Sequence, residues 1–324
     1  MPPRLPPLRA APALVPLVLV LGALRAWAGE LQVDVLDVGQ GDAILLRAPG
    51  GGTMLVDGGP GRSDVAAELA GRGITHLDWV VISHPHLDHI GGLDEVFRAV
   101  EVTRVLDGGY DESPSPTWIG LQGIMAGLGI PRQVARAGTS FDLGDEVEVE
   151  VLSPGRTFLR GTRSDANANS VVLRVDHGED CVYLAGDSEA LTEARIVRAG
   201  LEPCEVLKVA HHGSAYNTSD LFLDALRPEI AIVSVGTRNR YGHPSPETLG
   251  RLGRRGVAVY RTDVSHTLRV LSSGRGVEVL EDIGPARPAP APRTPATAEG
   301  ATRLPPPLPI GSDPGYRCGM EVAP

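Results

Sequence analysis

Short stretches of alternating apolar and polar residues run through most of this chain, and they predict β-strands that are buried on one face. Residues 31–38 are the first such stretch. Residues 39–42 turn the chain and residues 43–47 return, so these two stretches are expected to form a hairpin. Residues 79–82 are instead wholly apolar, which is typical of a strand buried on both faces. Further strands are expected at residues 53–57, 77–82, 102–106, 147–151, 169–175, 181–185, 205–210, 230–235, 258–261, 267–271 and 277–280.

Helical patterns lie between these strands, and several of them begin at residues that commonly cap helices. Ser63 is expected to cap a helix that runs to Arg72, and Ser188 one that runs to Ala199. Other helices are expected at residues 93–99, 117–128, 219–226 and 246–255. Strand-rich halves with helices between the strands predict an α/β protein in which two sheets pack face to face with helices outside. The last three strands are expected to close the sheet of the second half.

The composition is that of an ordinary globular protein, with 42% hydrophobic and 22% charged residues among 324. The formal net charge is −10, which argues against a broad basic face that follows a polyanion. It does not exclude an enzyme that meets one phosphodiester at a time, because bound metal ions can supply positive charge. Aromatic residues are only 4%, so platforms for stacking bases are expected to be few.

Both ends of the chain differ from the middle. Arg4 and Arg9 precede an apolar run at residues 10–24 and a small-x-small site at residues 26–28, a pattern that predicts a signal peptide at 1–28. An uncleaved anchor is the alternative, but the apolar run is short for a span of about 20 residues. We therefore expect a secreted or periplasmic protein without stable membrane insertion. The domain is expected at 29–283, and the Pro/Ala-rich residues 284–324 as a disordered tail.

The residues with the clearest chemistry directly follow the apolar run at 79–82. His84, His86, Asp88 and His89 fall within six positions of the chain. Imidazole and carboxylate groups together suit ions such as zinc and manganese. His84 and His86 alternate and could hold one ion, whereas Asp88 and His89 could hold a second. A polar loop rich in histidine is the structural alternative.

The segment His-Pro-His-Leu-Asp-His at residues 84–89 fits the HxHxDH signature of the metallo-β-lactamase superfamily. Four further segments, at residues 37–43, 56–59, 185–188 and 211–214, make residues 31–280 resemble the hydrolase domain of the ComEC/Rec2 competence proteins. The resemblance implies a four-layer αββα sandwich with two divalent ions at one edge between the sheets. It also implies a free-standing, exported relative of a single domain.

The resemblance assigns further metal ligands. Asp187 corresponds to the aspartate that bridges the two ions, although it could instead cap a helix. His212 corresponds to the last ligand, and His211 is expected beside the site, because one strand end does not easily direct two adjacent side chains to one ion. Asn167 stands where most members have a third histidine. An amide oxygen is the weaker ligand, so the first site is expected to bind its ion loosely or to prefer manganese or magnesium.

Other residues are expected to support this site. Asp57 either orients a ligand from beneath the metal loop or forms a turn before glycine. Lys208 lies within an apolar strand and needs a buried partner. Ser170 belongs to the family's Asn-x-x-Ser pattern. His243 could donate a proton or hold an oxyanion, or could belong to a simple turn.

The remaining histidines and the cysteines are predicted to be structural. His76, His177 and His266 match no motif and are expected at the surface or in turns. Cys181 and Cys204 each open a strand that leads to a predicted ligand, and an exported protein would permit a disulfide between them. Cys318 has no clear partner.

The ligand residues predict a metal-dependent hydrolase, and the resemblance to the competence proteins implies that it cleaves phosphodiester bonds of DNA, outside the cytoplasm. Two ions, zinc or manganese, would lower the pKa of a shared water, and Asp88, His211 and His243 are the candidate catalytic residues. One alternative is an exported hydrolase of another ester, such as a phosphocholine ester, a lactone or a β-lactam. Another is a metal-binding module of the same fold without catalytic activity.

Overall fold

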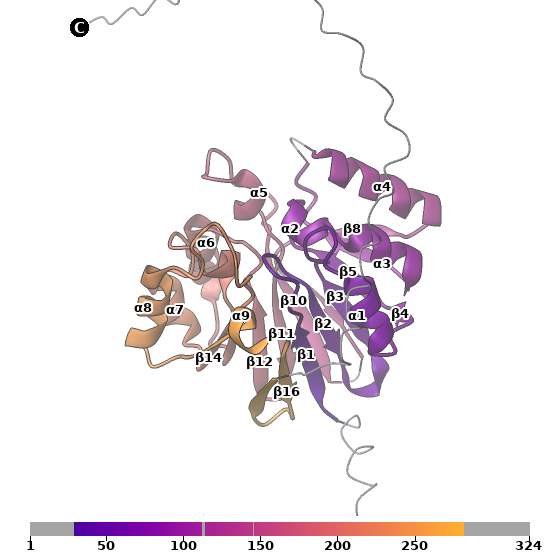
Figure 1. The fold of residues 1–324 in the computed structure, drawn as a ribbon. Coiled ribbons are helices and arrows are strands. Elements are labelled where there is room, and N and C mark those ends of the chain that lie inside the picture. The colour runs from indigo at the N-terminus through magenta and orange to yellow at the C-terminus, as the bar shows by residue number, and fades with distance from the viewer. Residues whose placement is uncertain (1–28, 112–113, 145, 282–324) are drawn as a thin grey trace, which may run out of the picture. The chain divides into compact units, whose positions relative to one another are not determined.

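The computed structural model describes residues 29–111, 114–144 and 146–281 of the chain (Figure 1). The predicted signal peptide at 1–28 and tail at 284–324 lie outside these residues. Within the described ranges, no helix is both long and apolar enough to cross a membrane.

Two mixed sheets form the centre of the fold. The first sheet consists, in order across the sheet, of β17 (Val277–Glu281), β16 (Leu268–Ser272), β1 (Leu31–Val35), β2 (Ile44–Arg47), β3 (Thr53–Val56), β5 (Trp79–Ile82), β7 (Val105–Asp107) and β8 (Arg132–Val134). The second consists of β15 (Ala258–Arg261), β14 (Ile230–Val233), β13 (Val206–Lys208), β12 (Asp180–Leu184), β11 (Val172–His177), β10 (Val147–Ser153) and β9 (Thr139–Asp142). A small separate pair joins β4 (His76–Leu77) to β6 (Glu101–Val102).

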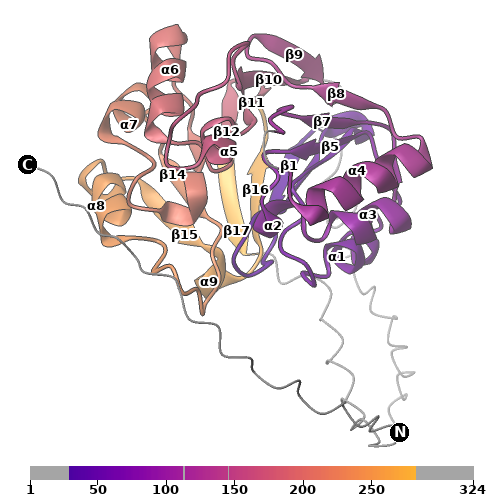
Figure 2. The same cartoon turned by 90° about the horizontal axis from the view of Figure 1, so that it is seen from above.

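Helices cover the outer face of each sheet. On the first sheet these are α1 (Val65–Gly71), α3 (Leu93–Ala99) and α4 (Pro116–Leu128); on the second they are α6 (Ala190–Gly200), α7 (Asp220–Leu226) and α8 (Pro246–Arg254) (Figures 1 and 2). The short helices α2 (Leu87–Ile90) and α5 (Asp165–Ala168) lie at one edge of the sandwich, and α9 (Thr262–Ser265) follows β15. Two further single turns are η1 (Pro49–Gly51) and η2 (Ala210–Gly213).

Alternating side chains on the strands build three apolar layers. On β10, Val147, Val149 and Val151 are buried against the first sheet, while the residues between them are partly or fully exposed. Strands β5 and β12 are buried on both faces, so their other apolar residues contact the helices outside. Helix, sheet, sheet and helix thus stack in four layers, and the predicted αββα sandwich is confirmed.

The direction of the strands determines where their loops gather. Strands β3, β5, β7 and β8 run parallel in the first sheet, and β12 to β15 run parallel in the second. The carboxyl ends of parallel strands meet at one edge of a sheet, and loops at that edge commonly form sites. The loops after β5, β12 and β13 carry the residues predicted to bind metal.

Several predicted elements are wrong in detail. The last strands do not all close one sheet: β15 ends the second sheet, but β16 and β17 return to the first, where β16 pairs with β1. The strand predicted at 169–175 begins only at Val172, because Asp165–Ala168 form α5. Strands β8 and β9 were not predicted, since their side chains are mostly exposed and show no apolar alternation.

The two predicted serine caps are also wrong, because each helix begins two residues after its serine. Helix α1 begins at Val65, and the Ser63 hydroxyl instead donates to the carbonyl of Gly58 (3.0 Å). Helix α6 begins at Ala190, and the carbonyl of Ser188 accepts a hydrogen bond from Asn217. Both serines are thus tied to the segments that carry the family motifs.

Cys181 and Cys204 form a disulfide, as the sequence predicted, with Cα atoms 5.0 Å apart. Cys181 lies in β12 and Cys204 immediately precedes β13, and these strands are parallel neighbours. The bond therefore joins the starts of two strands whose far ends lead to Asp187 and His212.

We expect loss of this disulfide to destabilise the domain by about 3 kcal/mol, because the bond closes a loop between residues 23 positions apart. Urea unfolding of a Cys181→Ala/Cys204→Ala variant, beside the oxidised and the reduced wild type, measures the change. Equal unfolding midpoints for all three would contradict the prediction.

Candidate metal centre

The loop after β5 folds back on itself and brings its histidines together. His84 follows Ser83 at the strand end, and α2 then turns the chain so that His89 returns toward His84. His84 and His89 are buried, with ring centroids 4.2 Å apart. His86 and Asp88 are only partly buried and lie nearer the solvent. His84 Nε2 lies 3.0 Å from His86 Nδ1.

Asp57, at the end of β3, holds this loop from beneath. Its carboxylate accepts hydrogen bonds from the Ser83 amide (2.8 Å), the Ser83 hydroxyl (2.6 Å) and Nδ1 of His89 (2.8 Å). Because Nδ1 of His89 donates to a carboxylate, its Nε2 is left to face the site. Asp57 also has a positive φ of 60°, so it forms the turn and orients a histidine as well.

Strand register places Asp187 beside the His211–His212 pair. Leu184 of β12 is opposite Lys208 of β13, and each predicted ligand follows its strand by about three residues. The His211 amide donates to the carbonyl of Gly186 at 3.1 Å, which fixes the two loops together. Asp187 itself is buried.

His211 and His212 do not continue the strand, so the strand alternation from which their directions were predicted does not apply to them. Both residues are in the left-handed region, with φ of 48° and 53°. Such backbone is unfavourable for residues other than glycine and clusters at functional sites. The turn directs both adjacent imidazoles toward Asp187: Nε2 of His211 lies 3.7 Å from Oδ2, and Nε2 of His212 lies 3.8 Å from Oδ1.

Asp187 is the centre of two groups of ligand atoms, one around each of its oxygens. Oδ1 lies 3.4 Å from Nε2 of His89, and Nε2 of His212 lies 3.5 Å from Oδ2 of Asp88. Oδ2 lies 3.7 Å from Nε2 of His84. Ligands about 2.0–2.2 Å from one ion are separated from each other by roughly 3–3.6 Å. The observed separations are close to this range on both sides of Asp187.

Several of these atoms are buried and have no hydrogen-bond partner among the described residues. They are Nε2 of His89, Nε2 of His212 and Oδ1 of Asp187. Buried polar atoms are normally paired, so a group of them facing one another needs an explanation. The other nitrogen of His212 donates to the carbonyl of Ser234 at 3.0 Å, which orients the ring so that Nε2 faces the other ligand atoms. The donor set therefore fits divalent metal ions.

The charges of the cluster are coupled. Burial opposes the charged form of each group and lowers the pKa of His84 and His86. At His89 the carboxylates outweigh burial, because Asp187 and Asp57 raise its pKa well above the usual value. Asp187 and Asp42 raise the pKa of His212 to about 9. The imidazoles in turn hold the pKa of Asp187 well below its usual value. A divalent cation can enter such a site in exchange for these protons.

Asp42 is a site residue to which the sequence analysis assigned no role. It is buried, and its Oδ2 forms an ion pair with Nζ of Lys208, the partner that a buried lysine requires. Its Oδ1 lies 3.4 Å from Nδ1 of His212. The signal was present in the sequence, because Asp42 belongs to one of the family motifs and Lys208 lacked a local partner.

Gly41, before Asp42, allows this loop to lie against the metal loop. Its φ is 150°, and a Cβ at this position would lie 2.2 Å from the carbonyl oxygen of Asp88. That carbonyl accepts a hydrogen bond from the Asp42 amide at 3.2 Å, and the carbonyl of Gly41 accepts one from the Ser234 hydroxyl at 2.6 Å. The loop after β1 thus connects the metal loop to the second sheet.

Asn167 and Ser170 lie at the same edge in different roles. The side-chain oxygen of Asn167 accepts a hydrogen bond from the Ser164 hydroxyl (3.0 Å), and its side-chain nitrogen lies 3.4 Å from Nδ1 of His211, so Asn167 orients that ring. Its role as a ligand of the first ion stays a prediction. Ser170 is fully buried, and its hydroxyl has no partner among the described residues.

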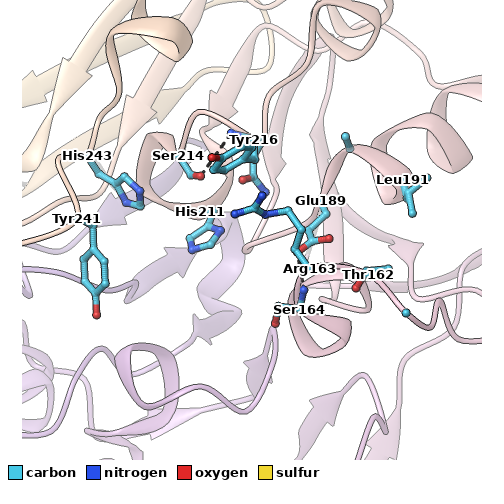
Figure 3. Close-up of a pocket in the computed structure, with 13 residues that line it drawn as sticks. Thr162, Arg163, Ser164, Glu189, Leu191, His211, Ser214, Tyr216, Tyr241 and His243 are labelled. Carbon is cyan, nitrogen blue, oxygen red and sulfur yellow. Dashed lines mark hydrogen bonds between the residues drawn. The ribbon is translucent and has the colours of Figure 1, made fainter. Parts of the chain in front are cut away.

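His243 lies on the far side of His211, with ring centroids 5.7 Å apart, and both residues line a cavity of about 680 Å³ (Figure 3). Burial and the neighbouring His211 and His212 lower the pKa of His243 to about 4. A neutral imidazole can donate a hydrogen bond to an oxyanion but carries no extra proton to give away. The low pKa of His243 therefore favours its predicted role in stabilising an oxyanion over its predicted role as a proton donor.

His177 corrects another expectation. It ends β11 beside a turn, as predicted, but it is buried rather than exposed. Its Nδ1 lies 2.8 Å from the Ser272 hydroxyl, which donates to Asp180 at 2.7 Å. The three residues join β16 of the first sheet to β11 and β12 of the second, away from the metal centre.

A family model described as the metallo-beta-lactamase superfamily matches residues 36–237. The match covers more than half of the chain, and the chain therefore belongs to this superfamily. Its fold binds divalent metal ions, often two, and its members are generally hydrolases.

Within the superfamily, the chain is similar to proteins that are named for the ComE operon and for recombination. It is 30% identical over 261 residues to ComE operon protein 3 of Bacillus subtilis (strain 168), covering 74% of this chain and 33% of that protein. It is 34% identical over 248 residues to Recombination protein 2 of Haemophilus influenzae, covering 74% and 28%. The chain thus spans about a third or less of the length of these relatives.

A solved structure shares the fold at low identity. CmlA, a diiron beta-hydroxylase from Streptomyces venezuelae, is 18% identical with a TM-score of 0.51, covering 79% of this chain and 54% of that chain. This likeness concerns the fold alone.

The Asp42–Lys208 pair gives a direct test of the site's support. We expect Lys208→Met to lower the free energy of unfolding by about 3–5 kcal/mol, because it leaves the buried Asp42 charge without a partner. The double variant Asp42→Asn/Lys208→Met removes both charges and should lose clearly less. Urea unfolding measures both, and equal losses in the single and double variants would contradict the predicted coupling.

Proposed function

We propose that this protein is a metal-dependent hydrolase of phosphodiester bonds and that its substrate is DNA. The observation that carries the proposal is the position of Asp187, whose two oxygens face separate groups of imidazoles and, on one side, a further carboxylate. A carboxylate placed in this way can bridge two ions, as hydrolysis by a pair of metals requires.

The ligands divide between the two oxygens of Asp187. His84, His86 and Asp187 Oδ2 would hold the first ion, with His211 in the place that Asn167 was expected to fill. Asp88, His89, His212 and Asp187 Oδ1 would hold the second ion. Nitrogen and carboxylate donors together suit zinc or manganese.

Bound ions of this kind lower the pKa of a water and stabilise negative charge on a phosphate oxygen. The chain's own residues prepare that chemistry. Asp57 and the Ser234 carbonyl fix the rings of His89 and His212, so their Nε2 atoms need not reorient. The neutral His243 faces the cavity beside His211, where it can donate a hydrogen bond to an oxygen of the reacting phosphate.

The choice of DNA as substrate is supported by similarity to relatives named for competence and recombination. The acidic chain is expected to meet one phosphodiester rather than to follow a long duplex. Hydrolysis of another ester and metal binding without catalysis are the outcomes that a test must separate from this proposal.

The proposal is tested with a substrate panel in the presence of added manganese or zinc. The panel contains single- and double-stranded DNA, bis-p-nitrophenyl phosphate and nitrocefin. We expect cleavage of DNA and of the phosphodiester, and a loss of more than about 100-fold in the His84→Ala/Asp88→Ala variant, since even residues that only orient ligands contribute 10- to 100-fold.

The matched control is His76→Ala/Asp78→Ala, which removes a histidine and an aspartate that form a half-exposed pair outside the metal centre. It should retain full activity. Turnover of nitrocefin alone would favour a β-lactam rather than a phosphodiester as the substrate. Metal binding without turnover of any member of the panel would contradict the proposal.

A further inference from the structure

The cavity beside the metal centre is large enough for a substantial part of a substrate. Its volume is about 680 Å³, within the usual range for small-molecule sites. Its lining includes His211 and His243, so it opens directly onto the proposed metal centre (Figure 3). A phosphodiester held at the metals would therefore extend one of its two substituents into this space.

One wall of the cavity carries a stacked pair of a cation and a ring. The guanidinium of Arg163 lies 3.6 Å from the centroid of the Tyr216 ring. Both side chains are exposed, Tyr216 by 61%. In the described part of the chain Arg163 pairs with no carboxylate, so its donors stay available. The outer face of the guanidinium can stack on a planar group while its N–H groups bind an anion.

The backbone under this pair is firmly held. The Tyr216 loop is fastened by Arg251, whose guanidinium donates to the carbonyls of Ala215 (2.9 Å) and Asn217 (2.8 Å). Next to Arg163, the amide and hydroxyl of Thr162 both donate to Asp165, at 2.7 and 2.6 Å. A rigid platform loses little entropy on binding, so it favours a defined ligand position.

The opposite wall carries a second aromatic ring. Tyr241 is 57% exposed, its ring stacks on that of His243, and the guanidinium of Arg240 lies 5.4 Å from its centroid. Asn239 closes this loop through hydrogen bonds to the amide (2.9 Å) and the carbonyl (2.8 Å) of His243. In Figure 3, Tyr241 and His243 lie on one side of His211 and Arg163 and Tyr216 on the other.

We propose that this cavity is a subsite for one unpaired nucleobase and the phosphate next to it, and that it makes the enzyme selective for single-stranded polynucleotides. The inference rests on the proposed function, because it assigns the group that follows the reacting phosphate. The base stacks between the Arg163–Tyr216 pair and Tyr241, and the phosphate binds the Arg163 guanidinium.

The carboxylate of Glu189 also lines the cavity and is consistent with this arrangement. It accepts a hydrogen bond from the Ser164 amide at 3.0 Å, so it fastens the loop that carries Arg163. Among the described residues Arg163 forms no ion pair with this carboxylate, so its guanidinium remains the group that binds the phosphate.

Selectivity for single strands follows from the chemistry of stacking. A base in a duplex has both faces covered by its neighbours and must be unstacked before another ring can take their place. An unpaired base presents its faces at little cost, and such stacking tolerates every base because each has a π-face. The subsite is therefore expected to favour single strands without a strong preference for sequence.

Binding is measured with the full chain and fluorescein-labelled oligo(dT), in EDTA and at low salt, so that cleavage does not consume the probe. Arg163→Ala and Tyr216→Ala should each weaken binding roughly 5- to 100-fold, the range that base–aromatic stacking contributes. Tyr216→Phe keeps the ring and should bind as the wild type does. A labelled blunt duplex should bind more weakly than the single strand.

Salt dependence separates charge from stacking. Arg163→Ala should reduce the slope of log affinity against log salt concentration by about 0.7, the contribution of one phosphate on a single strand. Tyr216→Ala should leave that slope unchanged. The matched control is Arg104→Ala, which removes an arginine that lies over Trp79 at the start of β5, the end opposite the metal loop, and should not alter binding.

The two proposals fail separately. Weaker binding of oligo(dT) by the Arg163→Ala and Tyr216→Ala variants supports the subsite, whether or not the wild type cleaves diesters. A wild type that cleaves no diester would overturn only the proposed function. The subsite alone would be overturned if the wild type cleaves diesters but the Arg163→Ala and Tyr216→Ala variants bind oligo(dT) as tightly as Arg104→Ala does. Equal affinity of the wild type for duplex and single strand would also overturn it.

Discussion

The structure depends on one buried carboxylate, Asp187, and on the positive partners that it requires. A buried charge is unfavourable unless it is compensated, and Asp187 is compensated on both oxygens. His89 and His212 face one oxygen, and His84 and His211 face the other. Because imidazoles face both oxygens of Asp187, the proposed site has room for one cation at each oxygen. The loops of the fold hold these imidazoles in position.

That arrangement requires both sheets. The loop after β5 belongs to the first sheet, and the loops after β12 and β13 belong to the second, so neither sheet alone builds the site. The two are joined beneath it by the buried Asp42–Lys208 ion pair and by the hydrogen bond from Ser234 to Gly41. Asp42 also lies beside His212. The contacts that hold the sheets together therefore also position a ligand.

Much of this was predictable from the sequence because it follows from local patterns. Alternation predicted most strands, and the resemblance of residues 31–280 implied the sandwich and its metal edge. The features that local patterns did not predict depend on turns and on contacts with distant parts of the chain. Strand alternation placed His211 beside the site, but a left-handed turn replaces the strand there and directs its ring toward Asp187. The return of β16 to β1 depends on contacts between residues distant in the chain, which no local pattern encodes.

The central claim is that Asp187 joins two metal ions, and metal stoichiometry tests it most directly. The wild type and an Asp187→Ala variant are dialysed with excess zinc or manganese, freed of loose ions and analysed for bound metal, with circular dichroism as the check of folding. The account predicts about two ions per folded wild-type chain and loss of both in the variant. A folded variant that retains both ions, or a wild type that binds neither metal, would contradict it.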